Sequence, residues 1–401
     1  MIKGETFVKD FNVDKFLSER AVSLKPSGIR KFFDIVNEFD DVISLTVGQP
    51  DFVTPWHIRD AAIKSLIEGK TYYTANAGTK ELRGEISNYL SRRFALNYSP
   101  DNEIITTIGG SEAIDLAIRV TVEPGDEVIV PLPSFVCYDP LITMCGGIPV
   151  HIVTTEKDGF KITPEALKAA ITPKTKLLVL PYPSNPTGAI MEKNDLEAIA
   201  DVIRDTNIGI LSDEIYAELT YGTKHVSIAS VDGMRERTIL ASGFSKAYAM
   251  TGWRLGYVCA PAKITTEIYK IHQYAIMCAP TPSQMGAIEA MKNGDDDVVQ
   301  MREEYDRRRK YIVGGLRELG LDCYEPRGAF YVFPNISKFG MTSEQFCEKL
   351  LYESKVAIVP GTAFGECGEG FARISYAYSV AHITEALERI KMFIEKIKQN
   401  G

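Results

Sequence analysis

The stretch TILASGFSKAYAMTGWRLGYVCAP (238–261) carries a single lysine, Lys246, among small residues and between two short apolar runs. The runs at 238–242 and 256–261 are candidate strands of a buried sheet. A buried lysine is costly unless its charge is paired or its amine takes part in a reaction. The stretch therefore indicates either a surface loop or a place where an amine does chemistry.

Further candidate strands lie on the N-terminal side of this stretch. Apolar runs at 103–108, 127–130, 176–180 and 208–213 alternate with helical patterns such as 111–122. Strands that are apolar on both faces and are separated by helices predict a mostly parallel sheet with helices on both sides. We therefore expect an α/β fold.

The sequence changes character in its last third, where a charged helical run at 301–319 begins the C-terminal part. The elements expected after it are strands at 329–334, 356–360 and 371–377 and helices near 342–354 and 382–399. This pattern predicts a smaller α/β domain over residues 291–401, after a large domain over residues 48–290. The N-terminal segment 1–47 contains a short amphipathic helix at 27–39 behind a serine cap, and we expect the segment to pack on the small domain.

Composition argues against several classes of protein. The 401 residues are 45% hydrophobic and 24% charged, which is an ordinary globular composition. A net charge of −8 without a basic tract argues against nucleic-acid binding, and no apolar run is long enough to span a membrane. The N-terminus lacks the apolar core of a signal peptide, and seven scattered cysteines suggest reduced thiols in the cytoplasm. Five separated histidines give no metal-binding spacing.

In a parallel sheet, ligands bind at the carboxyl ends of the strands, so the residues that follow the strands are candidates for a site. Gly110, Ser111 and Glu112 follow the strand at 103–108 and open a helix, where backbone N–H groups would attract an anion such as phosphate. By itself this motif is more typical of a plain helix cap with Ser111 as its first residue. Phe135 follows the next strand and could lie flat on a planar ring or simply belong to the core.

Two more strand ends carry polar groups. Asn185 lies in the loop PYPSNPTGA (181–189), whose three prolines and glycine fix its shape, with a cis X–Pro bond as one option. Its amide could donate to a ligand oxygen, or the loop could be only a rigid turn. Asp213 ends the strand at 208–213 and is followed three residues later by Tyr216. A protonated ring nitrogen would suit the buried carboxylate, and a helix cap is the alternative.

Lys246 and Arg254 complete this set of groups. A lysine amine becomes a good nucleophile when burial or nearby cations lower its pKa, and it can then form a Schiff base with an aldehyde. Arg254 offers a phosphate a bidentate partner that is always charged. One ligand has a phosphate for Gly110, Ser111, Glu112 and Arg254, a planar ring for Phe135, a basic ring nitrogen for Asp213, a phenolic oxygen for Asn185 and Tyr216, and an aldehyde for Lys246. That ligand is pyridoxal 5′-phosphate (PLP).

The sequence closely resembles the class I and II aminotransferases, PLP enzymes of fold type I, over residues 27–395. The blocks that carry the resemblance are LTVGQPDF (45–52), YTANAGTKELR (73–83), GGSEAI (109–114), PSNPTG (183–188), SDEIY (212–216), GFSKAYAMTGWRLGY (243–257) and ARISYA (372–377). The blocks at 27–52 and 301–310 are similar to a subgroup with archaeal aromatic aminotransferases, bacterial aspartate aminotransferase-like enzymes and N-acetyl-diaminopimelate aminotransferases. The resemblance implies a large domain with a mostly parallel central sheet flanked by helices, plus a smaller α/β domain.

The resemblance also implies roles for residues that their spacing does not reveal. Arg373 should bind the α-carboxylate of the substrate, assisted by the backbone of Gly48 and by Asn185. Tyr73 should reach the PLP phosphate of the neighbouring subunit, which makes the enzyme a homodimer with shared active sites.

One position departs from the pattern of the family. Many relatives have a phosphate-binding serine three residues before the lysine, where this chain has Gly243. Ser242 or Ser245 could supply that hydroxyl, and we include Ser245 in the predicted site.

The expected reaction is transamination between an L-amino acid and a 2-oxo acid such as 2-oxoglutarate, in a ping-pong cycle. Lys246 is expected to hold PLP and move the Cα proton, Asp213 to keep the ring nitrogen protonated, and Tyr216 to tune the ring oxygen. Aspartate, aromatic amino acids and N-acetyl-diaminopimelate all fit as donors. A PLP-dependent C–S β-lyase or a cyclopropane-forming synthase would use the same residues. A transcription regulator would need a DNA-binding module, for which 26 residues before the matching region are too few.

Overall fold

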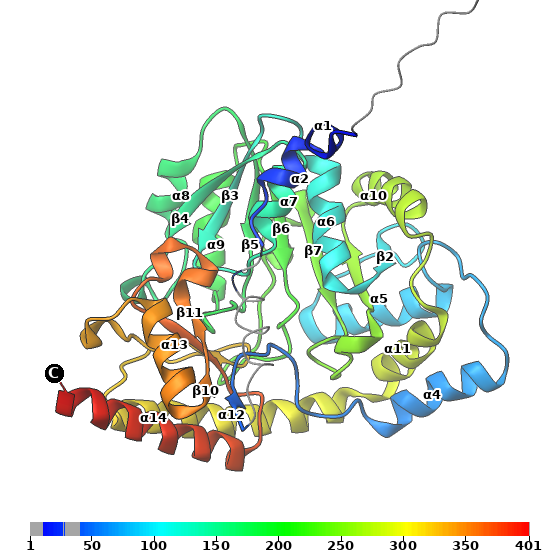
Figure 1. Cartoon of the computed structure of the whole chain (residues 1–401). Coiled ribbons are helices and arrows are strands. Elements are labelled where there is room, and N and C mark those ends of the chain that lie inside the picture. The colour runs from blue at the N-terminus through cyan, green and yellow to red at the C-terminus, as the bar shows by residue number, and fades with distance from the viewer. Residues whose placement is uncertain (1–10, 27, 29–40, 401) are drawn as a thin grey trace, which may run out of the picture.

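A seven-stranded sheet forms the centre of the molecule in this computed structural model, which describes residues 11–26, 28 and 41–400 (Figure 1). From edge to edge its strands are β2 (Ile104–Thr107), β8 (Gly256–Cys259), β7 (Thr238–Gly243), β6 (Gly209–Asp213), β5 (Thr175–Leu180), β3 (Glu127–Leu132) and β4 (Ile148–Val153). All of them run in one direction except β8, which is antiparallel to both of its neighbours. The predicted mostly parallel sheet is confirmed. The helix expected at 27–39 lies outside the described residues, apart from residue 28.

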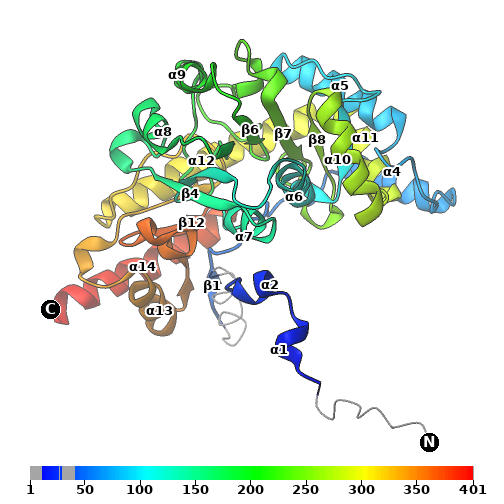
Figure 2. The same ribbon diagram turned by 90° about the horizontal axis from the view of Figure 1, so that it is seen from above.

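Helices cover both faces of this sheet, because successive residues of its inner strands are apolar and point to opposite sides. The covering helices are α6 (Gly109–Thr121), α7 (Tyr138–Met144) and α10 (Ala262–Ala275) on one face, and α8 (Pro164–Ala170) and α9 (Lys193–Ile203) on the other (Figure 2). On β5, Leu177 and Val179 pack against the first group, whereas Leu178 and Leu180 pack against the second. The burial of each such side chain contributes about 1.5–3 kcal/mol to the free energy of unfolding.

The edge strand β4 is not foreseen by the sequence pattern. Of its six residues only Ile152 is buried, and Pro149 and His151 interrupt the apolar sequence. A half-exposed edge strand therefore lacks the continuous apolar run that identifies the inner strands of a parallel sheet.

The C-terminal part folds around a second apolar core. Its helices are α12 (Asp295–Glu318), α13 (Ser343–Ser354) and α14 (Val380–Asn400), and its strands are β9 (Tyr331–Val332), β10 (Val356–Ala357), β11 (Val359–Pro360) and β12 (Ala372–Ser375). β12 lies between β11 and β9 in an antiparallel sheet, so Arg373 and Tyr331 come from neighbouring strands. β1 (Ile43–Ser44) pairs in parallel with β10, which brings the chain before Gly48 to this part of the molecule. The domain limits at residues 48 and 290 stay a prediction.

Three helices lie together near the β2 edge of the large sheet (Figure 1). They are α4 (Trp56–Ile67), α5 (Lys80–Phe94) and α11 (Thr281–Asn293). The loop 68–79 joins α4 to α5 and ends at Thr79, whose hydroxyl caps α5 by accepting the N–H of Leu82 at 3.2 Å. Of two short N-terminal helices, α1 (Val13–Phe16) projects from the rest of the molecule (Figure 2), whereas α2 (Glu19–Ser23) contacts α7 through Arg20, which donates to the carbonyl of Met144 at 3.3 Å. None of the helices in the described ranges is long and apolar enough to cross a membrane.

Candidate active site

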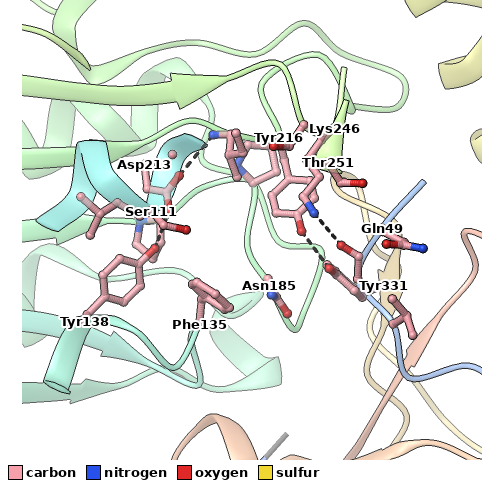
Figure 3. A pocket seen from close by; sticks show the side chains of 18 of the residues that line it. Gln49, Ser111, Phe135, Tyr138, Asn185, Asp213, Tyr216, Lys246, Thr251 and Tyr331 are labelled. Carbon is pink, nitrogen blue, oxygen red and sulfur yellow. Dashed lines mark hydrogen bonds between the residues drawn. The ribbon is translucent and has the colours of Figure 1, made fainter. Parts of the chain in front are cut away.

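A cavity of about 380 Å³ opens at the carboxyl ends of the strands (Figure 3). It brings together most of the residues selected from the sequence, namely Gly48, Gly110, Ser111, Phe135, Asn185, Asp213, Tyr216, Ser245, Lys246, Arg254 and Arg373. Many of them follow the five strands β2, β3, β5, β6 and β7, as the rule for parallel sheets predicts. Two selected residues, Glu112 and Tyr73, do not line this cavity.

One end of the cavity is built to receive an anion. Gly110 and Ser111 belong to the first turn of α6, where backbone N–H groups carry a partial positive charge. A side chain on Gly109 would lie 2.7 Å from a guanidinium nitrogen of Arg254, so the glycine lets the arginine lie against the start of this helix. Arg254 itself is held by a 3.0 Å hydrogen bond that its Nη1 donates to the carbonyl of Thr251. Thr251 also lines the cavity and was missed from the sequence.

The position of Gly243 has no space for a side chain. Gly243 pairs with Gly256 on the antiparallel strand β8, and a Cβ added to it would lie 2.8 Å from the Cα of Gly256. Of the two serines considered in its place, Ser245 lines the cavity. Ser242 does not, because its hydroxyl donates to the carbonyl of Glu214 at 3.1 Å. The hydroxyl of Ser245 therefore stays the predicted replacement.

Asp213 is the last residue of β6 and is buried. Tyr138, at the start of α7, donates its hydroxyl to Oδ2 at 2.7 Å, and the N–H of Ile215 donates to Oδ1 at 3.2 Å. Burial raises the pKa of Asp213, and these two hydrogen bonds oppose that rise. A protonated ring nitrogen next to the carboxylate would favour its charged form in the same way. Tyr138 was not predicted from the sequence.

Lys246 lies in the loop after β7 and donates from Nζ to the carbonyl of Gly48 at 2.5 Å (Figure 3). Burial, together with the nearby cations Arg373 and Arg254, lowers the pKa of Lys246 to about 8, against a smaller opposing effect of Asp213. An amine with this pKa is half neutral near pH 8, which makes it available as a nucleophile and as a base.

Tyr216 contacts a second tyrosine that the sequence did not indicate. Its hydroxyl lies 2.8 Å from the hydroxyl of Tyr331, which is fully buried and also lines the cavity. A side chain on Gly48 would overlap the Tyr331 hydroxyl. Gly48 thus lets its own backbone approach both Lys246 and this tyrosine pair.

Arg373 is almost fully buried and is held in one orientation. Its guanidinium carbon lies 4.5 Å from the ring centre of Tyr331 and 4.8 Å from that of Phe364. Nη1 donates to Oδ1 of Asn185 at 2.9 Å and Nη2 to the carbonyl of Thr46 at 2.5 Å, while Nε has no hydrogen-bond partner in the described part of the chain. Burial lowers the pKa of Arg373, so a carboxylate is the partner that this buried cation requires.

Of the remaining cavity residues, Asn185 contacts Arg373 and Phe135 contacts Tyr138. Asn185 uses its oxygen for Arg373, which leaves its amide N–H groups for another acceptor. Phe135 meets Tyr138 edge to face, with ring centres 6.4 Å apart. The Asn185 loop contains cis bonds at Tyr182–Pro183 and Asn185–Pro186, as the three prolines allowed.

These groups fit PLP. The buried Asp213 carboxylate gains from a cationic ring nitrogen, the lowered pKa of Lys246 suits an aldehyde partner, and Gly110, Ser111 and Arg254 form an anion site. The unpaired Nε of Arg373 suits the carboxylate of an amino acid. The individual roles of these residues stay a prediction.

Comparisons with known proteins agree with this chemistry. A family profile described as aminotransferase class I and II matches residues 40–390. The putative aminotransferase YugH of Bacillus subtilis (strain 168) is 54% identical over 381 residues, covering 95% of this chain and 99% of that protein. The probable N-acetyl-LL-diaminopimelate aminotransferase of the same strain is 46% identical over 387 residues, which cover 96% of this chain and 98% of that protein. The crystal structure of the aromatic aminotransferase from Pyrococcus horikoshii OT3 has a TM-score of 0.87 at 43% identity, and the match covers 92% of this chain and 99% of that chain.

Proposed function

Because the chain belongs to the class I and II aminotransferases, which depend on PLP, we propose that it transfers an amino group from an aspartate-like, aromatic or N-acetyl-diaminopimelate-type donor to 2-oxoglutarate. The observation that carries the proposal is one cavity that joins Lys246, whose pKa is lowered to about 8, with Asp213 and Arg373. An amine, a carboxylate and a guanidinium in this arrangement meet the needs of cofactor and substrate together.

PLP, when bound, supplies an electron-withdrawing ring that makes the Cα proton of an amino acid removable. In the proposed site, Lys246 would hold the aldehyde carbon, Asp213 the ring nitrogen, and Ser111, Ser245 and Arg254 the phosphate. The face of Phe135 and the donor groups of Asn185 and Tyr216 would hold the ring and its oxygen. This assignment leaves Arg373 and the backbone of Gly48 for the substrate.

The chain's own residues perform the remaining work. Arg373, kept flat between two aromatic rings, binds the substrate carboxylate and so keeps Cα inside the cavity. Lys246 accepts the proton from Cα, and its lowered pKa keeps part of the amine neutral for that purpose. Arg373 and Arg254 both contribute to the lowered pKa, so the groups proposed to bind anions also prepare the base.

A panel of amino donors assayed with 2-oxoglutarate tests the proposed reaction. We expect one donor class among aspartate, aromatic amino acids and N-acetyl-LL-diaminopimelate to yield glutamate in amounts equal to the donor consumed. A C–S β-lyase with the same residues would instead cleave a donor with sulfur at Cβ, such as cystathionine, which the panel includes, and would release a thiol, ammonia and a 2-oxo acid without consuming 2-oxoglutarate. That outcome, or the absence of transfer from every donor, would contradict the proposal.

Replacing Arg373 by lysine should raise the KM for the amino donor by about tenfold to a hundredfold, with a smaller change in kcat. Lysine keeps the charge but loses the bidentate fork and the stacking between Tyr331 and Phe364. Steady-state kinetics measure both constants. Arg119→Lys is a matched control, since Arg119 pairs with Asp115 on the surface of α6. An unchanged KM in Arg373→Lys would show that the arginine does not bind the donor.

We propose further that the enzyme is a homodimer in which Tyr73 serves the active site of the partner. The backbone on both sides of Tyr73 is fixed, because Thr281 Oγ1 donates to the carbonyl of Tyr72 at 2.7 Å and Gln284 Nε2 donates to Thr74 Oγ1 at 2.9 Å. The Tyr73 residue between them is nevertheless 75% exposed. A tyrosine held outward on a fixed loop is suited to a second subunit, and sedimentation analysis measures whether that subunit is present.

The exposed face of α4 supports the same arrangement. Trp56, Ile63 and Ile67 lie at helical spacing and are 61%, 43% and 80% exposed. Large apolar side chains that gather on one exposed helix face are typical of an interface. We therefore place the proposed dimer contact on α4 and on the loop that follows it.

The cysteines support a cytoplasmic location. All seven cysteines are free thiols, so none of them forms a disulfide. Reduced cysteines are typical of proteins in reducing compartments, and we propose the cytoplasm on this basis. Cell fractionation with an antibody to the chain tests it.

A further inference from the structure

His272 is a fully buried histidine that the proposed reaction does not use. It lies on α10, outside the cavity, and joins two other segments of the chain. Its Nδ1 lies 2.7 Å from Oε1 of Glu112, and its Nε2 lies 2.9 Å from the carbonyl oxygen of Asn76. The second carboxylate oxygen of Glu112 accepts the N–H of Ile108, the residue before α6. Three segments of the chain, namely α10, the start of α6 and the loop that contains Asn76, therefore meet at one imidazole and one carboxyl group.

The hydrogen-bonding capacity of these groups fixes the proton count of the pair. The carbonyl of Asn76 can only accept, so Nε2 of His272 must carry a hydrogen. Nδ1 faces a carboxyl oxygen, and one hydrogen must lie between them. The pair is therefore an imidazolium with a carboxylate, or a neutral imidazole with a carboxylic acid. In both forms it is neutral overall, which is the state in which a buried ionisable pair is least costly.

The two segments held by this pair are both next to proposed phosphate ligands. Glu112 follows Gly110 and Ser111 in the first turn of α6, and its carboxylate fixes the backbone immediately before that turn. Asn76 lies in the loop 68–79, three residues after Tyr73. The loop is also tied to α11, but only His272 connects it to α6 in the hydrogen bonds of the described residues.

We infer that His272 and Glu112 are positioning residues for the cofactor phosphate, an inference that rests on the proposed function. The pair sets the start of α6 for the phosphate of its own subunit and the loop of Tyr73 for that of the partner. Glu112 thus acts through its side chain as an anchor, in addition to the backbone N–H expected from the sequence.

The test compares the binding of PLP with that of pyridoxal, which has the same ring and aldehyde but no phosphate. Dissociation constants are measured on the full-length protein by titration of the visible absorbance that the aldehyde gains on linkage to Lys246. Glu112→Ala and His272→Leu should weaken PLP binding by about tenfold or more. Pyridoxal binding should change by less than about threefold, since it does not use the phosphate site.

Glu112→Gln provides the conservative variant. Its amide can donate to Nδ1 of a neutral His272 and still accept the N–H of Ile108, so PLP binding should stay within about threefold of the original. His151→Leu removes a second histidine–carboxylate pair, with Asp139 at 2.9 Å, far from these segments in the sheet, and should not affect either ligand. If His272→Leu does not fold, Glu112→Ala carries the test.

Two results would overturn the inference. Equal losses of PLP and pyridoxal binding in Glu112→Ala would indicate general damage to the fold, and unchanged PLP binding would show that the pair does not position the phosphate site. Failure of the unaltered protein to bind PLP would instead contradict the proposed function itself. The two failures are therefore distinguishable in one experiment.

Discussion

The Lys246→Ala variant is expected to show no measurable transamination. The change removes both the amine that would hold the aldehyde carbon and the base that moves the Cα proton. General base catalysis alone contributes about 10²–10⁴-fold, so we expect the rate to fall by at least about 10⁴-fold. A steady-state assay measures the rate, and titration with PLP should give none of the visible absorbance of the lysine-linked cofactor.

The fold of this variant should survive the substitution. The folded-state pKa of Lys246, about 8, lies below its ordinary value of 10.5. As the pH falls from 10.5 towards 8, the unfolded chain binds this proton more readily than the folded chain, so the buried lysine lowers the stability of the cofactor-free fold, and alanine removes that effect. We expect the Tm of the cofactor-free variant at pH 7 to be no lower than that of the original chain. Lys270→Ala, at the surface of α10 beside Glu267, is the matched control. Near-normal turnover without Lys246 would refute the assignment.

The second large effect is expected for Asp213→Asn, which should retain bound PLP but lose several orders of magnitude in kcat. An amide cannot neutralise a protonated ring nitrogen, so the ring would withdraw electrons poorly. The amide also has one acceptor oxygen where the carboxylate has two, so it cannot accept from both Tyr138 and Ile215 in the observed way. Single-turnover kinetics with pre-bound PLP measure the chemical step without the influence of cofactor binding.

Two further variants define the meaning of that result. Tyr138→Phe removes one hydrogen bond to Asp213 but keeps the charge, and we expect a loss of about tenfold, near 1.4 kcal/mol. Asp139→Asn changes the neighbouring carboxylate, which pairs with His151 at the surface, and should leave kcat unchanged. A fall of less than tenfold in Asp213→Asn would argue against its role at the ring nitrogen.

The sequence predicted the chemistry of the site, but it did not identify all of the residues that form it. Residues that directly follow apolar strands, such as Asp213 and Lys246, could be selected because parallel strands direct their carboxyl ends to one edge. Tyr138 and Tyr331 could not, because one begins a helix and the other lies in a two-residue strand of the C-terminal part. Their places in the cavity result from tertiary packing, for which a single sequence contains no local signal.

For the same reason, the sequence could not predict the partner of the Glu112 side chain or the lack of space at Gly243. The first turn of α6 was a recognisable anion site, but the partner of the Glu112 side chain, His272, lies 160 residues further along the chain. At Gly243, the strand partner Gly256 determines that no side chain fits, and this requires the antiparallel register of β7 and β8. Sequence patterns describe a residue and its near neighbours, whereas both of these contacts depend on the pairing of distant segments.

The residues proposed for the cofactor and those proposed for the substrate carboxylate are synthesised at different times. Within the cavity of one subunit, the groups proposed to contact the cofactor lie between residues 110 and 254, at the ends of the strands of the seven-stranded sheet or in the segments that follow them. The proposed carboxylate site needs Thr46, near the beginning of the chain, together with Tyr331 and Arg373, near its end. A growing chain can therefore complete its cofactor groups long before it can bind an amino acid.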